Sequence, residues 1–178
     1  MKEITIQIPE GKKAVLTFVD KSDNRPVTER IKTFEDACNA LGDEHPLVTQ
    51  YRLTAAAYKG EPMTKDLMAY LKLRIIVAAL NEGWEPKFTE DEYRYFPWFY
   101  LYTKEQYDKL DDEEKGLCVL RSGNYTNSYY GFVHCNAYYD ASYSYAVSGY
   151  GLRLAFRTRE LAAYAGRQFI KEYLDYIC

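Results

Sequence analysis

The stretch from Gly116 to Arg159 lacks five residue types altogether. It contains no Lys, Glu, Gln, Met or Trp, although the 178-residue chain has 37 residues of these types, and uniform usage would place about nine of them there. Between Ser122 and Tyr150, Asp140 is the only residue counted as charged. Because this segment has no Lys or Arg to neutralise phosphates, and the chain carries a net charge of −3, nucleic acid is not an expected partner.

Histidine is scarce and cysteines are widely spaced, which argues against a metal site and against catalysis. The chain has two histidines and four cysteines, without a CxxC pair. His134 and Cys135 would supply only two of the four ligands of a structural zinc site. The GxSxG, GxGxxG, HExxH and P-loop motifs are also missing. We therefore expect no enzyme activity, no metal and no cofactor.

Long apolar runs are absent as well. No stretch approaches the length of a membrane span, and the N-terminal MKEITIQIPEGKK lacks the continuous apolar run of a secretory signal. We expect synthesis in the cytoplasm and no membrane insertion. Hydrophobic residues make up 47% of the chain, which is enough for one domain with a buried core.

Most of the local patterns predict helices. Residues 1–32 are expected to be a hairpin, in which isoleucines alternate with polar residues, followed by a polar linker over 20–32. Residues 33–178 then form a single domain. Its helices are predicted over 34–41, 47–58, 64–82 and 159–176, with short helices after Thr89 and Thr103 and a short strand over 117–120. The aromatic stretch 84–102 is predicted to lie mostly in the core.

The helix over 64–82 is the most strongly patterned. Leu67, Leu71, Ile75 and Ala79 recur every four residues, and further apolar residues widen this stripe past one face. We expect the helix to be buried on most sides and to serve as the scaffold of the domain.

A tyrosine-rich segment over 122–150 is the main candidate for a functional site. It holds eight of the 19 tyrosines together with five Ser, three Asn and three Gly. Antibody loops use this mixture, because Tyr gives a large contact area with few torsions to freeze and the small polar residues give adaptable hydrogen bonds. The alternative is a pair of strands whose tyrosines follow strand propensity. The predicted contact residues are Asn124, Tyr125, Asn127, Tyr129, Tyr130, Asn136, Tyr138, Tyr139, Asp140, Tyr143 and Tyr145.

The chain resembles a group of proteins from gut-bacterial phages, prophages and mobile elements, from which no activity can be carried over. The resemblance rests on NEGWEP (81–86), YFPWFYLY (95–102) and GLRLAFRTRELAAYAGRQFIKEYLDYI (151–177). Members of the group differ in the Tyr/Ser/Gly segment. The five residue types missing from 116–159 are those that codons ending in a pyrimidine cannot encode. Adenine-directed mutagenesis of such codons by diversity-generating retroelements yields only the other fifteen residue types. The resemblance therefore implies a variable protein.

A second resemblance concerns the fold. Gly151-Leu152-Arg153-Leu154 is similar to the G-F-R-L string that ends the C-type lectin-like fold of retroelement-diversified proteins and of formylglycine-generating enzymes. We therefore expect an α+β fold: a helical N-terminal part, then a small antiparallel, C-type lectin-like C-terminal part closed by a C-terminal helix. The calcium-binding motifs of sugar-binding lectins are absent. A different scaffold with an analogous variable surface is the alternative.

These patterns together predict a phage-derived binding protein that presents 122–150 to a protein or glycan partner, for example in host recognition. Such a protein would be virion-associated or released by lysis. The alternative is an intracellular interaction protein, either an inhibitor of a host defence enzyme or a structural virion component, in which the same surface forms a homo-oligomer interface.

Overall fold

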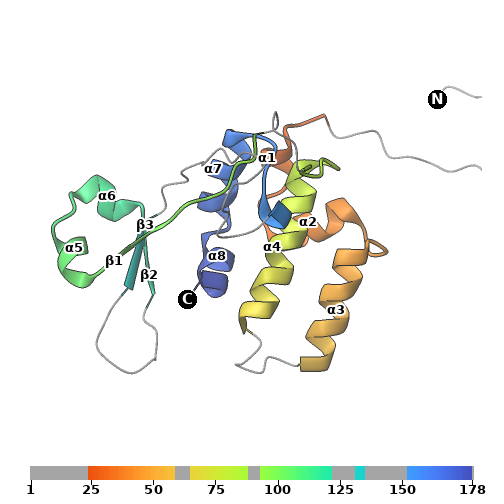
Figure 1. Ribbon diagram of the computed structural model, residues 1–178, viewed down its shortest axis with the longest axis horizontal. Helices are drawn as coiled ribbons and strands as arrows, with labels where there is room; N and C mark the ends of the chain where they lie inside the picture. The colour runs from red at the N-terminus through yellow and green to blue at the C-terminus, as the bar shows by residue number, and fades with distance from the viewer. Residues whose placement is uncertain (1–23, 59–64, 88–92, 122–130, 135–151, 178) are drawn as a thin grey trace, which may run out of the picture.

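A computed structural model describes residues 24–58, 65–87, 93–121, 131–134 and 152–177 (Figure 1). Most of these residues are helical. The longer helices form one body, and three short strands with two short helices form a second group beside it, on the left of Figure 1.

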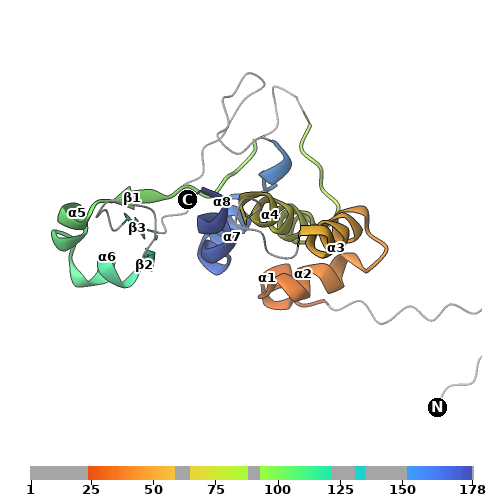
Figure 2. The same cartoon turned by 90° about the horizontal axis from the view of Figure 1, so that it is seen from below.

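The centre of the body is α4 (Lys65–Asn81). It packs between α8 (Ile170–Ile177) on one side and α2 (Phe34–Leu41) and α3 (Pro46–Tyr58) on the other, as Figure 2 shows. The prediction that this helix is buried on most sides is confirmed. Leu67, the first residue of the predicted stripe, is nevertheless 41% exposed. The buried residues of α4 are Ala69, Leu71, Leu73, Ile75, Ile76, Val77, Ala79, Leu80 and Asn81.

Helix α2 has both of its predicted end residues. The hydroxyl of Thr33 accepts a hydrogen bond from the backbone N–H of Asp36 at 3.1 Å, and the Asp36 carboxylate accepts one from the Thr33 N–H at 2.9 Å. This capping box satisfies backbone donors that the helix leaves open. At the other end Gly42 has a φ of +86°, in the region that favours glycine.

The structure differs from the predicted linker over 20–32. Residues Val27–Arg30 form a single helical turn, α1. Val27 and Ile31 are buried in the main core, because they lie four residues apart on the side that faces the body. The core therefore extends into a stretch whose sequence is mostly polar.

The closing helix is two helices, α7 (Arg159–Gln168) and α8, rather than one. Phe169 stands between them with φ −112° and ψ +30°. Its N–H still donates to the carbonyl of Ala165 at 3.0 Å, and the N–H of Tyr173 donates to the carbonyl of Phe169 at 3.2 Å. The predicted apolar stripe through Leu161, Ala165, Phe169 and Tyr173 is buried across the break.

The second group contains a three-stranded antiparallel sheet of strands β1 (Tyr100–Tyr102), β2 (Cys118–Arg121) and β3 (Gly131–His134), in the order β1-β3-β2. Helices α5 (Lys104–Asp108) and α6 (Asp112–Gly116) connect β1 to β2. Each begins with a capping box, and the one at Thr103 was predicted. The box predicted at Thr89 lies outside the described residues.

The aromatic stretch joins this sheet to the helical body. Phe96 and Phe99 are buried, and the ring of Phe99 lies 5.2 Å from that of Tyr173 in α8. Tyr93 and Trp98 are 47% and 43% exposed. The predicted core role therefore holds for the two phenylalanines and not for these two residues.

The predicted fold class is wrong. An α+β fold with a C-type lectin-like C-terminal part would place an extensive antiparallel sheet after the helices. The described residues instead form a mostly helical structure, in which the strands have three or four residues each and no lectin-like sheet is present. Gly151 lies outside the described residues, and Leu152–Leu154 form a 3₁₀ turn, labelled η2, rather than a terminal lectin strand.

Candidate functional site

All eleven predicted contact residues, from Asn124 to Tyr145, lie outside the described residues. The structure describes only β3 within the tyrosine-rich segment. It does describe the framework on both sides of the two remaining stretches, 122–130 and 135–151. The prediction that these residues form a binding surface therefore stays a prediction, and the framework is what the structure adds.

The first stretch connects two paired strands. β2 and β3 are antiparallel, with Arg121 opposite Gly131 and Cys118 opposite His134. The chain therefore leaves the sheet at Arg121 and returns to it at the neighbouring position on β3. Strand pairing of this kind fixes the separation of the two ends of a connection.

The second stretch ends at a buried anchor. After η2, Ala155 and Phe156 are both 0% exposed. The N–H of Tyr95 donates to the carbonyl of Phe156 at 3.1 Å, and the N–H of Phe156 donates to the carbonyl of Tyr95 at 2.8 Å. The chain that follows 135–151 is therefore tied to the strand-like stretch before β1.

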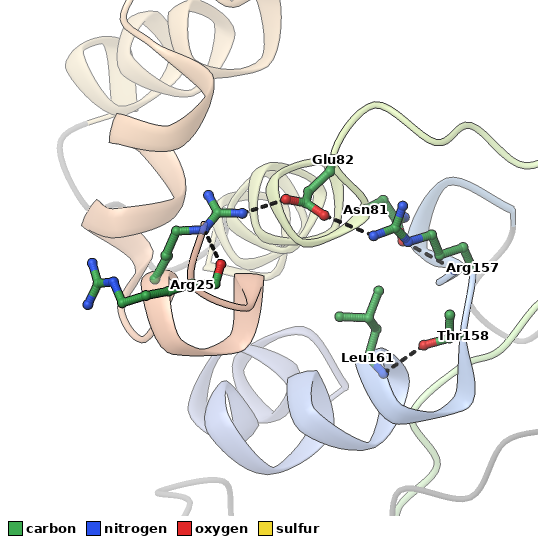
Figure 3. A network of polar contacts seen from close by, with 7 residues as sticks. Arg25, Asn81, Glu82, Arg157, Thr158 and Leu161 are labelled. Carbon is green, nitrogen blue, oxygen red and sulfur yellow. Dashed lines mark hydrogen bonds and ion pairs between the residues drawn. The ribbon is translucent and has the colours of Figure 1, made fainter. Parts of the chain in front are cut away.

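Asn81, the last residue of α4, strengthens this anchor (Figure 3). Its side chain is buried, with Nδ2 donating to the carbonyl of Ala155 at 2.8 Å and Oδ1 accepting from the N–H of Arg157 at 3.2 Å. The amide of Asn81 thus supplies a donor to the carbonyl of Ala155 and an acceptor to the N–H of Arg157, on either side of the bridged residue Phe156. Thr158 then caps α7, accepting from the N–H of Leu161 at 3.2 Å.

Glu82 links the same region to α1. Its carboxylate pairs with the guanidinium of Arg30 and, at 2.9 Å, with that of Arg157 (Figure 3). Arg30 also donates to the carbonyl of Arg25 at 3.0 Å. These side chains are partly exposed, so each pair contributes less than about 1 kcal/mol. These ion pairs connect three segments that are far apart in the sequence: α1, the end of α4 and the residues before α7.

A cavity of about 310 Å³ lies beside the end of α4, and Asn81 and Ala155 are among the residues that line it. One wall is the face of α4 that carries Arg74, Val77 and Asn81, spaced so that they lie on one side of the helix. Trp84 and Arg153, a residue of η2, also line the cavity. The cavity therefore adjoins the anchor at the end of the tyrosine-rich segment.

Reactive groups are few in the part of the chain that the structure describes. Burial raises the pKa of the Cys38 thiol and that of the Cys118 thiol, so both stay protonated near neutral pH and are poor nucleophiles. No group of three or more His, Cys, Asp and Glu side chains could hold a metal ion within the described ranges. Among the described helices, none combines the length and the apolar character needed to cross a membrane.

The sequence did not predict the contacts of Asn81 and Glu82, or the cavity beside them. The sequence predicts that Asn81 and Glu82 end a helix and that Trp84 lies in a core aromatic stretch, and it gives Arg153 only as part of a string similar to a lectin motif. One feature of the sequence could have indicated the cavity: Arg74 is a charged residue inside the apolar run of α4, and it is only half-buried there. The contact of Asn81 with Ala155, 74 residues away, has no local pattern that would reveal it.

Comparisons of the chain with protein-family models, with curated proteins and with solved structures found no match. The resemblance to phage and prophage proteins therefore stays a prediction from the sequence.

Proposed function

We propose that this chain is a phage-derived binding protein in which residues 122–150 contact a protein or glycan partner. The observation that supports this proposal is the way in which the described framework holds the segment. Paired strands lie at both ends of 122–130, and buried, bridged residues follow 135–151. A framework that fixes the ends of variable connections is a general design for binding loops.

The composition of the segment supplies the chemistry of contact. Its tyrosines would anchor the partner, since an aromatic ring with a terminal hydroxyl offers both apolar area and a hydrogen bond. Asn, Ser and the single Asp140 would add directed polar contacts. The resemblance to phage and prophage proteins favours a partner on a bacterial surface.

The proposal is tested by replacing Tyr125, Tyr129, Tyr138 and Tyr143 together with Ala. The labelled wild-type protein is applied to an array of bacterial surface glycans and to intact gut-bacterial cells. We expect it to bind at least one of these targets, and we expect the fourfold variant to lose that binding while its Tm stays within about 2 °C.

The matched controls are two single variants, Tyr58→Ala and Tyr93→Ala, because these tyrosines of the framework are 46% and 47% exposed. Both control variants should bind like the wild type. Wild-type protein that binds neither array nor cells would contradict the proposal. So would unchanged binding by the fourfold variant, or a fall in its Tm of more than about 5 °C, which would mean that the segment is core.

Self-association through the same segment is the alternative, and it is separated by molar mass. Light scattering after size exclusion should give the same mass for the wild type and the fourfold variant if the segment binds a foreign partner. A wild-type dimer that dissociates in the variant would instead assign the segment to an interface between copies of the chain.

A further inference from the structure

Two arginines that line the cavity beside α4 and η2 have no acidic partner among the described residues. Arg74 is half-buried and Arg153 is exposed, and neither makes a hydrogen bond or an ion pair with any described residue. Nearby arginines behave differently. The Glu82 carboxylate forms ion pairs with both Arg30 and Arg157, and Asp43 pairs with Arg52 of α3 at 2.8 Å.

The remaining polar groups of the cavity do not change this balance. Glu85 also lines it and makes no hydrogen bond or ion pair with the described residues, so the described lining carries two guanidinium groups and one carboxylate. The Asn81 side chain already binds the backbone at Ala155 and Arg157. It therefore does not compete for the two arginines.

The rest of the lining is apolar and suits a flat organic body. Trp84 is half-buried and contributes an aromatic wall, and Val77 and Ala155 are buried beside it. A volume of about 310 Å³ is at the lower end of the range for small-molecule sites. Planar guanidinium groups bind carboxylate and phosphate oxygens through paired hydrogen bonds.

We propose that this cavity binds a small organic anion, with its carboxylate or phosphate head between Arg74 and Arg153 and its apolar body against Trp84. This site is distinct from residues 122–150 and does not rest on the function proposed for them.

The test uses the intrinsic fluorescence of Trp84. The chain has two tryptophans, and Trp98 is 43% exposed, so Trp98→Phe leaves Trp84 as the only tryptophan. The full-length W98F protein is titrated with benzoate, with phenyl phosphate and with the neutral benzamide. Titration calorimetry on the wild type provides a second measurement that does not depend on fluorescence.

We expect benzoate or phenyl phosphate to give a saturable change with a Kd below about 10 mM, and benzamide to bind at least about fivefold more weakly. The ratio of the benzoate and phenyl phosphate constants identifies the preferred head group. Absence of saturation by both anions up to about 10 mM, or equal binding of benzamide, would overturn the proposal.

The arginines are tested by Arg74→Gln and Arg153→Gln, with Arg167→Gln as the matched control because Arg167 is exposed on α7 outside the cavity. We expect each cavity variant to weaken binding of the better anion by about tenfold and the control to leave it unchanged. Because Arg153 is exposed, R153Q keeps the test decisive if R74Q does not fold. Binding by folded R153Q within about twofold of the W98F parent would overturn the proposal.

Discussion

Asn81 and Glu82 are adjacent residues at the end of α4 that hold two different segments of the chain. The Asn81 amide is buried and binds the backbone of the residues that follow η2, whereas the Glu82 carboxylate is partly exposed and binds arginine side chains. Burial makes the first interaction the stronger one, because a buried backbone group that loses its partner is not rescued by water.

Asn81→Ala should therefore lower the free energy of unfolding by more than the loss of an exposed amide side chain would. It leaves the carbonyl of Ala155 and the N–H of Arg157 without their partner, which costs about 2 to 4 kcal/mol in the free energy of unfolding. Urea denaturation measures this loss. Asn39→Ala, at an exposed position of α2, is the control and should cost less than about 0.5 kcal/mol. A loss as small for Asn81 as for Asn39 would contradict the role of this anchor.

Asp36 gives the capping box of α2 a pH dependence. Hydrogen bonds from the N–H of Lys32, then from Thr33, lower the pKa of the Asp36 carboxyl below its ordinary value. A lowered pKa in the folded state means that the charged form stabilises the fold. This contribution is present above the ordinary pKa and is lost as the pH falls through the lowered one.

Asp36→Asn keeps an acceptor at this position and removes only the charge. We expect it to lower the free energy of unfolding at about pH 6, and we expect this difference from the wild type to shrink as the pH falls through the lowered pKa of Asp36. Thermal or urea unfolding over this pH range measures the difference. A difference that stays constant with pH would show that the Asp36 charge does not stabilise the folded state.

At the scale of elements, the turn that ends α4 positions the contacts that Asn81 and Glu82 make with the residues after η2 and with α1. Glu82 has a φ of +49° and Gly83 a φ of +85°, so the chain leaves the helix through two left-handed residues and directs Trp84 toward the cavity wall. Only glycine adopts such a φ without a conformational cost. A Cβ added at Gly83 would meet no atom within 4 Å, so the cost of a side chain there is purely conformational.

Gly83→Ala should consequently lower the free energy of unfolding by about 1 kcal/mol. The matched control is Gly116→Ala, because Gly116 is the last residue of α6 and its added Cβ also meets nothing within 4 Å. In a helical conformation Ala is favoured over Gly, so this control should be neutral or slightly stabilising. Equal effects of the two substitutions in parallel denaturation curves would argue against a strained turn at Gly83.

The elements differ in how far their sequences predict them. α2 and α4 were predictable because local chemistry marks them: Thr33 and Gly42 bound the first, and an unbroken apolar pattern marks the second. α1 was missed because only Val27 and Ile31 are apolar in a polar stretch. The break at Phe169 leaves no trace in the pattern, since the apolar stripe continues through it.

At the scale of the whole molecule, long-range contacts explain why the fold class was predicted wrongly. The pairing of β1 with β3 and the bridge between Tyr95 and Phe156 join segments separated by at least two other elements. A four-residue similarity at 151–154 suggested a lectin strand, but Leu154 to Phe156 are buried against the helical body and continue into α7. Local strings of this length carry too little information to set a topology.

The described residues thus form a helical body and a small sheet, and β3 of that sheet belongs to the tyrosine-rich segment. The proposed function requires that tyrosines of residues 122–150 are exposed to solvent. Nitration of the native protein with tetranitromethane, followed by peptide mapping over time, measures the solvent exposure of each tyrosine ring. Tyr58 and Tyr93 serve as exposed references at 46% and 47%, and Tyr173 serves as the buried reference at 0%.

We expect at least Tyr125, Tyr129, Tyr138 and Tyr143 to be nitrated at rates close to those of Tyr58 and Tyr93, while Tyr173 remains unmodified until the protein unfolds, because the reagent requires solvent access to the ring. Protection of the segment's tyrosines to the level of Tyr173 in the monomeric protein would contradict the account, since it would place them in the core.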